Sequence, residues 1–162
     1  MPTDTHAKTP AALDPLTLPE INRTGYPAPF AADVAGRFYR RLGPLLGLTQ
    51  FGVSIARLEP GAWSSQRHWH ENEDEFLYVM EGRPTLVTDQ GEQELQPGMV
   101  AGFPAGAPNG HHLINKSDRP ALVLVVGTKA AADCAHYSDV DLLYRREADG
   151  KEGFFKKSGE KY

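Results

Sequence analysis

Hydrophobic residues alternate with small or polar ones in the middle of the chain, in short segments that turn residues separate. In the first of these segments Phe51, Val53 and Ile55 are every second residue, and the pattern stops at Pro60 and Gly61. A repeat of two residues predicts a β-strand with one buried face. Further segments of this kind lie at 76–80, 85–88, 92–95, 99–103, 111–114 and 121–128.

The connections between these strands are short and rich in glycine and proline, and none is long enough for a helical crossover. Parallel strands need such a crossover, whereas antiparallel strands are joined by tight turns. We therefore predict an all-β fold, an antiparallel sandwich or barrel over residues 51–128.

The two ends of the chain differ from this central unit. Six prolines fall within residues 1–30, which favours an extended, irregular arm. Val34, Phe38 and Leu42 recur every four residues and predict one short helix over 31–42, so that residues 1–50 form an arm and a helix. The sequence becomes highly charged towards its end, and we expect residues 129–162 to form a peripheral tail.

One face of the strand at 76–80 has no obvious cover. Phe76, Tyr78 and Met80 have the opposite parity to Glu75 and therefore point to the opposite face. A large exposed apolar patch is unusual in a monomer. Either the arm 1–30 folds back over its own barrel or it crosses to a twofold partner, and of the two we expect the homodimer.

Charge and composition exclude several classes of function. Seventeen Lys and Arg residues against 21 Asp and Glu residues give a net charge of −4, which does not favour nucleic acid as a partner. The longest apolar run, 121–127, is far below the roughly 20 residues of a membrane-spanning helix. The chain has one cysteine, Cys134, and no apolar signal segment at its start, so we expect a reducing compartment, the cytoplasm.

Histidines and a glutamate cluster between two of the predicted strands. His68 and His70 are two residues apart, so in a strand both side chains project from the same face while Trp69 points away. Glu75 begins the next strand and can offer a carboxylate oxygen to the same interior. His111 begins a later strand, where alternation places His112 on the opposite face.

These residues resemble the two motifs of the cupin superfamily. The first motif is matched by Gly61, His68, His70, Glu75 and Gly82, and the second by Gly98, Pro104, Gly106, His111 and Asn115. His111 stands four residues before Asn115, as the family pattern requires, although the second-motif histidine more often falls where this chain has Asn109. The resemblance covers residues 51–128, about half of the chain.

The resemblance implies a double-stranded β-helix, or jelly-roll, barrel that is often dimeric. It also implies one divalent metal ion held by His68, His70, Glu75 and His111. Nitrogen and oxygen ligands suit Mn, Fe, Ni, Co and Zn alike, so the identity of the transition metal stays open. We interpret the other histidines, His6, His112 and His136, as residues that do not bind the ion, and Cys134 as inert.

The expected substrate is a small, oxygen-rich molecule such as a sugar, a sugar phosphate or a hydroxy acid. Ser64 and Gln66 share the parity of the two motif histidines, and Arg57 lies on the preceding strand near the expected mouth of the barrel. We expect these three residues to bind the substrate. No residue beyond the metal ligands stands out as catalytic.

The resemblance points first to a metal-dependent sugar or sugar-phosphate isomerase or epimerase. A second hypothesis is a non-haem iron oxygenase, which iron content and oxygen consumption would distinguish. A third is a cupin that binds a small molecule without catalysis, because a fold does not determine a function.

Overall fold

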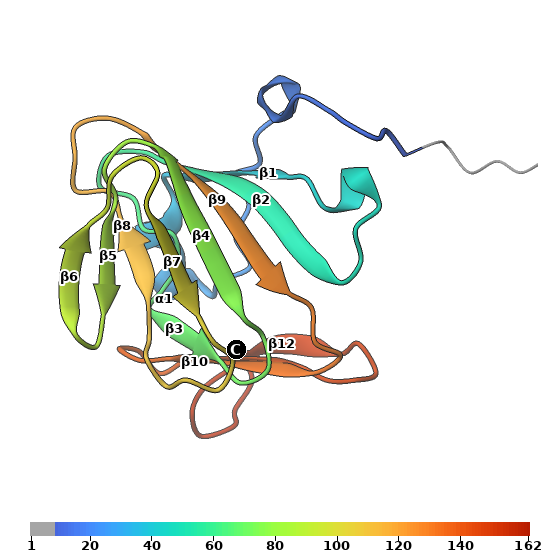
Figure 1. Cartoon of the computed structure of the whole chain (residues 1–162). Helices are drawn as coiled ribbons and strands as arrows, with labels where there is room; N and C mark the ends of the chain where they lie inside the picture. Colours follow the sequence, from blue (N-terminus) through green and yellow to red (C-terminus); the bar gives the residue numbers. More distant parts are fainter. Residues whose placement is uncertain (1–8) are drawn as a thin grey trace, which may run out of the picture.

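The computed structural model describes residues 9–162, which fold into a β-barrel with an additional sheet at one end (Figure 1). His6 lies outside the described residues. The twelve strands of the described chain are β1 (Arg37–Arg41), β2 (Phe51–Leu58), β3 (His68–His70), β4 (Glu75–Glu81), β5 (Thr85–Thr88), β6 (Gly91–Glu94), β7 (Val100–Phe103), β8 (His112–Ile114), β9 (Ala121–Thr128), β10 (Asp133–Tyr137), β11 (Leu143–Arg146) and β12 (Glu152–Phe155). Its helical turns are η1 (Pro15–Thr17), α1 (Ala28–Ala31), η2 (Ala32–Val34) and η3 (Pro44–Leu46). None of the helices in this part of the chain is long and apolar enough to cross a membrane.

The strands form three antiparallel sheets. The largest has the order β1-β2-β9-β4-β7, the second β12-β11-β10-β3 and the third β6-β5-β8. One hydrophobic core joins the first and third sheets, since Leu77 and Val123 pack in the same cluster as Leu86 and Leu113. A smaller cluster around Ala135, Tyr137 and Leu142 lies under the second sheet. The all-β antiparallel fold predicted from the sequence is thus confirmed.

The predicted strands of the central unit are all present. β2 contains the alternating segment from Phe51, and β9 has the predicted bounds, Ala121–Thr128. Two motif residues hold turns beside these strands. Gly82 has a positive φ of 79°, and a Cβ atom there would lie 2.7 Å from the backbone of Ala121. The fully buried Asn115 donates through Nδ2 to the carbonyls of Leu58 and Arg119, at 2.9 and 2.7 Å.

The helix predicted over residues 31–42 is wrong for most of its length. Helical structure ends at Val34, and residues 37–41 form β1, which pairs with β2 along its whole length. The spacing of Val34, Phe38 and Leu42 resembles a helical repeat. In the sheet, however, Phe38 lies on the outer face and stacks under the Arg57 guanidinium, with 4.4 Å from Cζ to the ring centroid. The described part of the segment 1–50, residues 9–50, is therefore not a separate unit, because β1 is an edge strand of the barrel.

The C-terminal segment also differs from our expectation of a peripheral tail. Residues 129–162 contain three strands, and β10 pairs with β3, the strand that carries two of the motif histidines. Residues His70 and Ala135 are opposite one another in this register, as are His68 and Tyr137. The C-terminal strands therefore support the site directly.

The described part of the N-terminal arm packs on the same chain. Ile21 forms an isolated antiparallel bridge with Tyr39, and the Glu20 carboxylate binds Arg40 and Arg57 on the outside of the barrel. Tyr26 and Phe30 pack against the cluster under the second sheet. This segment does not reach the outer face of β4 and β7, where Phe76 and Tyr78 stay exposed.

Candidate metal centre

The alternation of side chains along β3 places the first two metal-ligand candidates on the same face of the strand. His68 and His70 are the first and last residues of this three-residue strand, so their rings project from the same face and lie 5.0 Å apart between centroids. Trp69 points to the other face, where its ring stacks on that of His136 at 4.3 Å. The strand thus separates an inner histidine pair from an outer aromatic pair.

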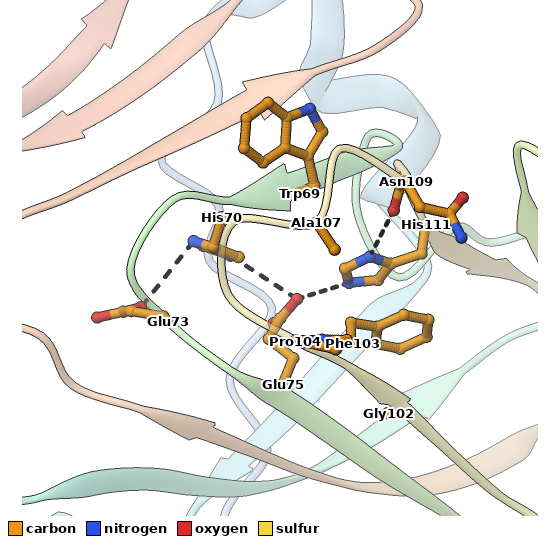
Figure 2. A pocket seen from close by; sticks show the side chains of 10 residues that line it. All are labelled: Trp69, His70, Glu73, Glu75, Gly102, Phe103, Pro104, Ala107, Asn109 and His111. Carbon is orange, nitrogen blue, oxygen red and sulfur yellow. Dashed lines mark hydrogen bonds and ion pairs between the residues drawn. The ribbon is translucent and has the colours of Figure 1, made fainter.

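The Glu75 carboxylate lies in the middle of three imidazole rings, of which Figure 2 shows those of His70 and His111. Its Oε2 atom is 2.6 Å from His111 Nε2, 3.5 Å from His68 Nε2 and 3.7 Å from His70 Nε2. His111 is positioned by Phe103, whose ring lies parallel to it with 3.5 Å between centroids. The structure therefore brings together all four ligands expected from the sequence.

The arrangement fits a single divalent ion. Metal–nitrogen and metal–oxygen bonds of about 2.1 Å place neighbouring ligand atoms about 3 Å apart, and the three distances to Glu75 Oε2 bracket that value. Ligand atoms of His68, His70 and Glu75 all lie within 4.8 Å of one another. Three imidazole nitrogens and one carboxylate oxygen suit a first-row transition metal.

The opposite ring nitrogens of the three histidines face acceptors. His68 Nδ1 is 2.8 Å from the Gln66 carbonyl, His70 Nδ1 is 2.6 Å from Asp133 Oδ2, and His111 Nδ1 is 3.5 Å from the Asn109 carbonyl. A proton on Nδ1 can be donated to these acceptors, which leaves the Nε2 lone pair for an ion. Such outer hydrogen bonds orient metal-binding histidines and raise their basicity.

The charges of the site match this interpretation. Burial alone would raise the pKa of Glu75, but hydrogen bonds from His111 and His68 outweigh burial and hold the pKa well below its ordinary value. The carboxylate is therefore ionised at neutral pH. Burial lowers the pKa of His111, which favours its neutral ring. Burial opposes a charge on His68 as well, but the hydrogen bond to Glu75 raises its pKa.

Two cavities meet at the ligands. The smaller, of about 60 Å³, lies beside His70 and Trp69 (Figure 2), and the larger, of about 250 Å³, lies beside His68. Glu75, Phe103 and His111 line both. The larger cavity is also lined by residues from β1 and the arm, namely Tyr26, Arg37 and Tyr39.

Only one of the three expected substrate-binding residues lines the larger cavity. Ser64 is on its wall, where its Oγ accepts a hydrogen bond from the Leu113 backbone. Gln66 is buried against the arm and donates through Nε2 to Phe30 O and Asp33 Oδ2. The strand begins only at His68, so the parity of the histidines does not extend back to Gln66.

Arg57 was also misplaced by our prediction. The inner face of β2 carries Ala56 and Leu58, so Arg57 between them points outward. There it is bound to Glu20 and Glu59. Its role in the structure is to hold the arm on the barrel.

Sequence reasoning missed Arg37, Tyr39 and Asp133. The first two were hidden by the helical interpretation of 31–42, although the alternation of Arg37, Tyr39 and Arg41 is itself a strand pattern. Asp133 lies in the segment expected to be peripheral, and no local motif marks it. Its side chain is 1% exposed and joins the C-terminal sheet to His70.

Within the described residues, the other two histidines and the cysteine make their contacts away from the four ligand candidates. His112 Nδ1 bonds to the Ser65 carbonyl at 2.9 Å, and His136 bonds to Glu71 on the outer face of the second sheet. Cys134 is buried beside these outer residues, and burial raises the pKa of its thiol.

Comparisons with known proteins agree with the geometry. Residues 54–127 match the family model described as Cupin domain. The structure resembles that of a sugar phosphate isomerase of the cupin superfamily from Silicibacter pomeroyi, with 46% sequence identity and a TM-score of 0.88. The match covers 93% of this chain and 96% of that chain. A putative sugar phosphate isomerase from Acidithiobacillus ferrooxidans has 27% identity and a TM-score of 0.71, covering 79% and 82% of the two chains.

A more distant solved structure shares the fold alone. The polyketide cyclase RemF from Streptomyces resistomycificus has 22% identity and a TM-score of 0.61, and the match covers 72% of this chain and 78% of that chain. A search of the curated proteins gives no significant match.

The Asp133 carboxylate offers a direct test of how the site is supported. Asp133→Asn should lower the affinity for a divalent metal about 10- to 100-fold, because the buried charge that accepts the His70 proton is lost. Competition with a chromophoric chelator measures this affinity. The matched control is Asp149→Asn, which changes an exposed carboxylate paired with Lys151 and should have no effect. Equal affinities of Asp133→Asn and the unaltered protein would contradict the assignment.

Proposed function

Because the chain belongs to the cupin superfamily, we propose that it is a metal-dependent isomerase that acts on a sugar phosphate. The observation that carries the proposal is the position of the ligand cluster on the wall of a cavity that also bears Arg37, Tyr39 and Tyr26. The volume of the cavity, about 250 Å³, is slightly below the roughly 300–1,000 Å³ that is typical of small-molecule pockets. The likeness to the isomerase of Silicibacter pomeroyi supports the same substrate class.

Four residues would hold the ion, His68, His70, Glu75 and His111. A divalent ion in that position supplies Lewis acidity, which polarises a carbonyl group or acidifies a hydroxyl group of the substrate. Interconversion of an aldose and a ketose moves a proton between neighbouring carbons, and such a reaction gains from this polarisation.

The proton transfer requires a base on the cavity wall. Glu75 is the only carboxylate that lines the larger cavity within residues 9–162. Its Oε2 atom faces the three histidines, while its Oε1 atom forms no hydrogen bond with another described residue. We assign to Oε1 the proton that leaves one carbon of the substrate and returns to its neighbour.

Two tyrosines line the same cavity, and the hydroxyl of one of them, Tyr26, accepts a hydrogen bond from the Gln66 backbone at 3.2 Å. Burial raises the pKa of both Tyr26 and Tyr39, so each keeps its proton at neutral pH. Neutral hydroxyl groups can donate hydrogen bonds to and accept them from sugar hydroxyls. Arg37 contributes a permanent positive charge and lies 4.9 Å from the Tyr39 ring centroid.

The proposed reaction is tested by incubating the metal-loaded protein with a panel of aldose and ketose phosphates in D2O. We expect interconversion of at least one pair with deuterium incorporated at the carbon next to the carbonyl, because the base exchanges its proton with solvent. Removal of the metal by a chelator should abolish conversion, and its return should restore it. Binding without turnover would support a non-enzymatic cupin instead, and oxygen consumption with bound iron would support an oxygenase.

We also propose that the chain forms a homodimer through the outer face of β4 and β7. Phe76, Tyr78 and Val100 are 42%, 40% and 56% exposed, and Tyr78 is opposite Val100 in the register of the two strands. The three side chains thus form one apolar patch, which described residues of the arm leave uncovered. A twofold pair of such patches would remove this surface from water.

Sedimentation tests this proposal. The intact chain should sediment at twice its mass of 17.8 kDa, and the double variant Phe76→Ser/Tyr78→Ser should sediment as a monomer that still binds metal. The control Leu16→Ser removes an exposed apolar side chain, 59% exposed, from η1, which is not part of the sheet that carries the patch. A monomeric intact chain would contradict the proposal.

A further inference from the structure

A basic groove adjoins the larger cavity. It has a volume of about 440 Å³, and it shares Arg37, Tyr39 and Val125 with that cavity, so the two are continuous. Its remaining basic side chains are Arg41 at the end of β1, Lys129 just after β9, and Arg146 on β11. The groove therefore leads away from the metal ligands towards a region of positive charge.

Two glycines lie in the sheet between these charges and the metal ligands, so no side chain projects into the groove there. Glu75 is opposite Gly127 in the sheet, and Gly127 is in turn opposite Gly52. Neither glycine carries a side chain, and a Cβ atom at Gly127 would lie 3.9 Å from Glu75 Cγ. Nothing on this row of the sheet therefore separates Glu75 from the groove.

The arginines on the inner and outer faces of β1 and β2 differ in the groups that bind them. On the outer face, Arg40 and Arg57 are both bound to Glu20. On the inner face, Arg37 donates to the Ser64 carbonyl at 2.5 Å. No carboxylate in residues 9–162 forms an ion pair with Arg37, Arg41 or Lys129.

Arg146 is the exception within the groove, because Glu73 neutralises it. Three positive charges thus remain together in a protein whose net charge is −4. Charges of one sign repel each other, so such a cluster is favourable when an anion joins it. The structure pairs the outward-facing arginines with a carboxylate and leaves the inward-facing ones without a carboxylate partner in residues 9–162.

We propose that Arg41 and Lys129 bind the phosphate group of a substrate whose carbonyl end reaches the metal ligands, and that Arg37, where the groove meets the larger cavity, contacts the sugar. This inference rests on the proposed function and adds the residues that select a phosphorylated sugar over a free one. Three strand spacings, roughly 14 Å, separate the backbones of β1 and β4. Arginine side chains that extend back from β1 reduce this gap to one that a short phosphorylated sugar can bridge.

Arginine and lysine would bind the phosphate group in different ways. The planar guanidinium group of Arg41 can present two parallel N–H groups to phosphate oxygens. The ammonium group of Lys129 adds a point charge from the opposite side of the groove. Tyr39 lies between Arg37 and Arg41 on β1 and lines both the groove and the larger cavity.

The test is a calorimetric titration of the metal-loaded, full-length protein with inorganic phosphate. Arg41→Gln and Lys129→Gln should each weaken phosphate binding about tenfold or more, because each removes one charge-assisted contact. Arg83→Gln and Lys151→Gln are matched controls, because they change exposed side chains outside the groove. Metal content and melting temperature should be the same in all five proteins.

The outcomes separate this proposal from the proposed function. If phosphate binds the unaltered protein and both groove variants equally, or does not bind the unaltered protein, the groove is not a phosphate site. If the groove variants lose phosphate but no sugar phosphate is converted, the site stands and the isomerase proposal fails. If sugar phosphates are converted and neither variant raises KM, the isomerase stands and the groove assignment is wrong.

Discussion

A half-buried carboxylate among three imidazole rings is the constraint on which the structure depends. Removing the charge of Glu75 from water is costly unless nearby groups compensate it. The three Nε2 atoms at 2.6–3.7 Å from Oε2 can do so only if two strands and one loop end bring them together. The barrel is the scaffold that meets this requirement, because its hydrophobic core fixes β4 and β8 relative to each other.

The second sheet extends this constraint beyond the barrel. β3 carries two of the histidines but has only three residues, and it gains most of its backbone pairing from β10. Asp133 on β10 then fixes the ring of His70 through a 2.6 Å hydrogen bond. The C-terminal sheet thus holds the metal-ligand candidates in place through direct contacts.

The sequence allowed prediction of the central strands and the four ligand candidates because both depend on local patterns. The repeat of two residues from Phe51 indicated β2, the continuous apolar run from Ala121 indicated β9, and the spacing of His68 and His70 determines that they share a face. β1 was missed because Val34, Phe38 and Leu42 have a spacing compatible with a helix, and only pairing with β2 decides against it. Asp133, Arg37 and the groove depend on contacts between distant segments, which no local pattern encodes.

The central claim is that His68, His70, Glu75 and His111 hold one ion at the end of the barrel. X-ray absorption at the metal edge, on protein purified without a metal-affinity tag, tests it most directly. The account predicts one ion per chain with nitrogen and oxygen neighbours at about 2.1 Å, outer scattering from imidazole rings and no sulfur neighbour. A sulfur neighbour would place the ion at Cys134, the only cysteine, and would contradict the account, as would a chain that binds no stoichiometric ion.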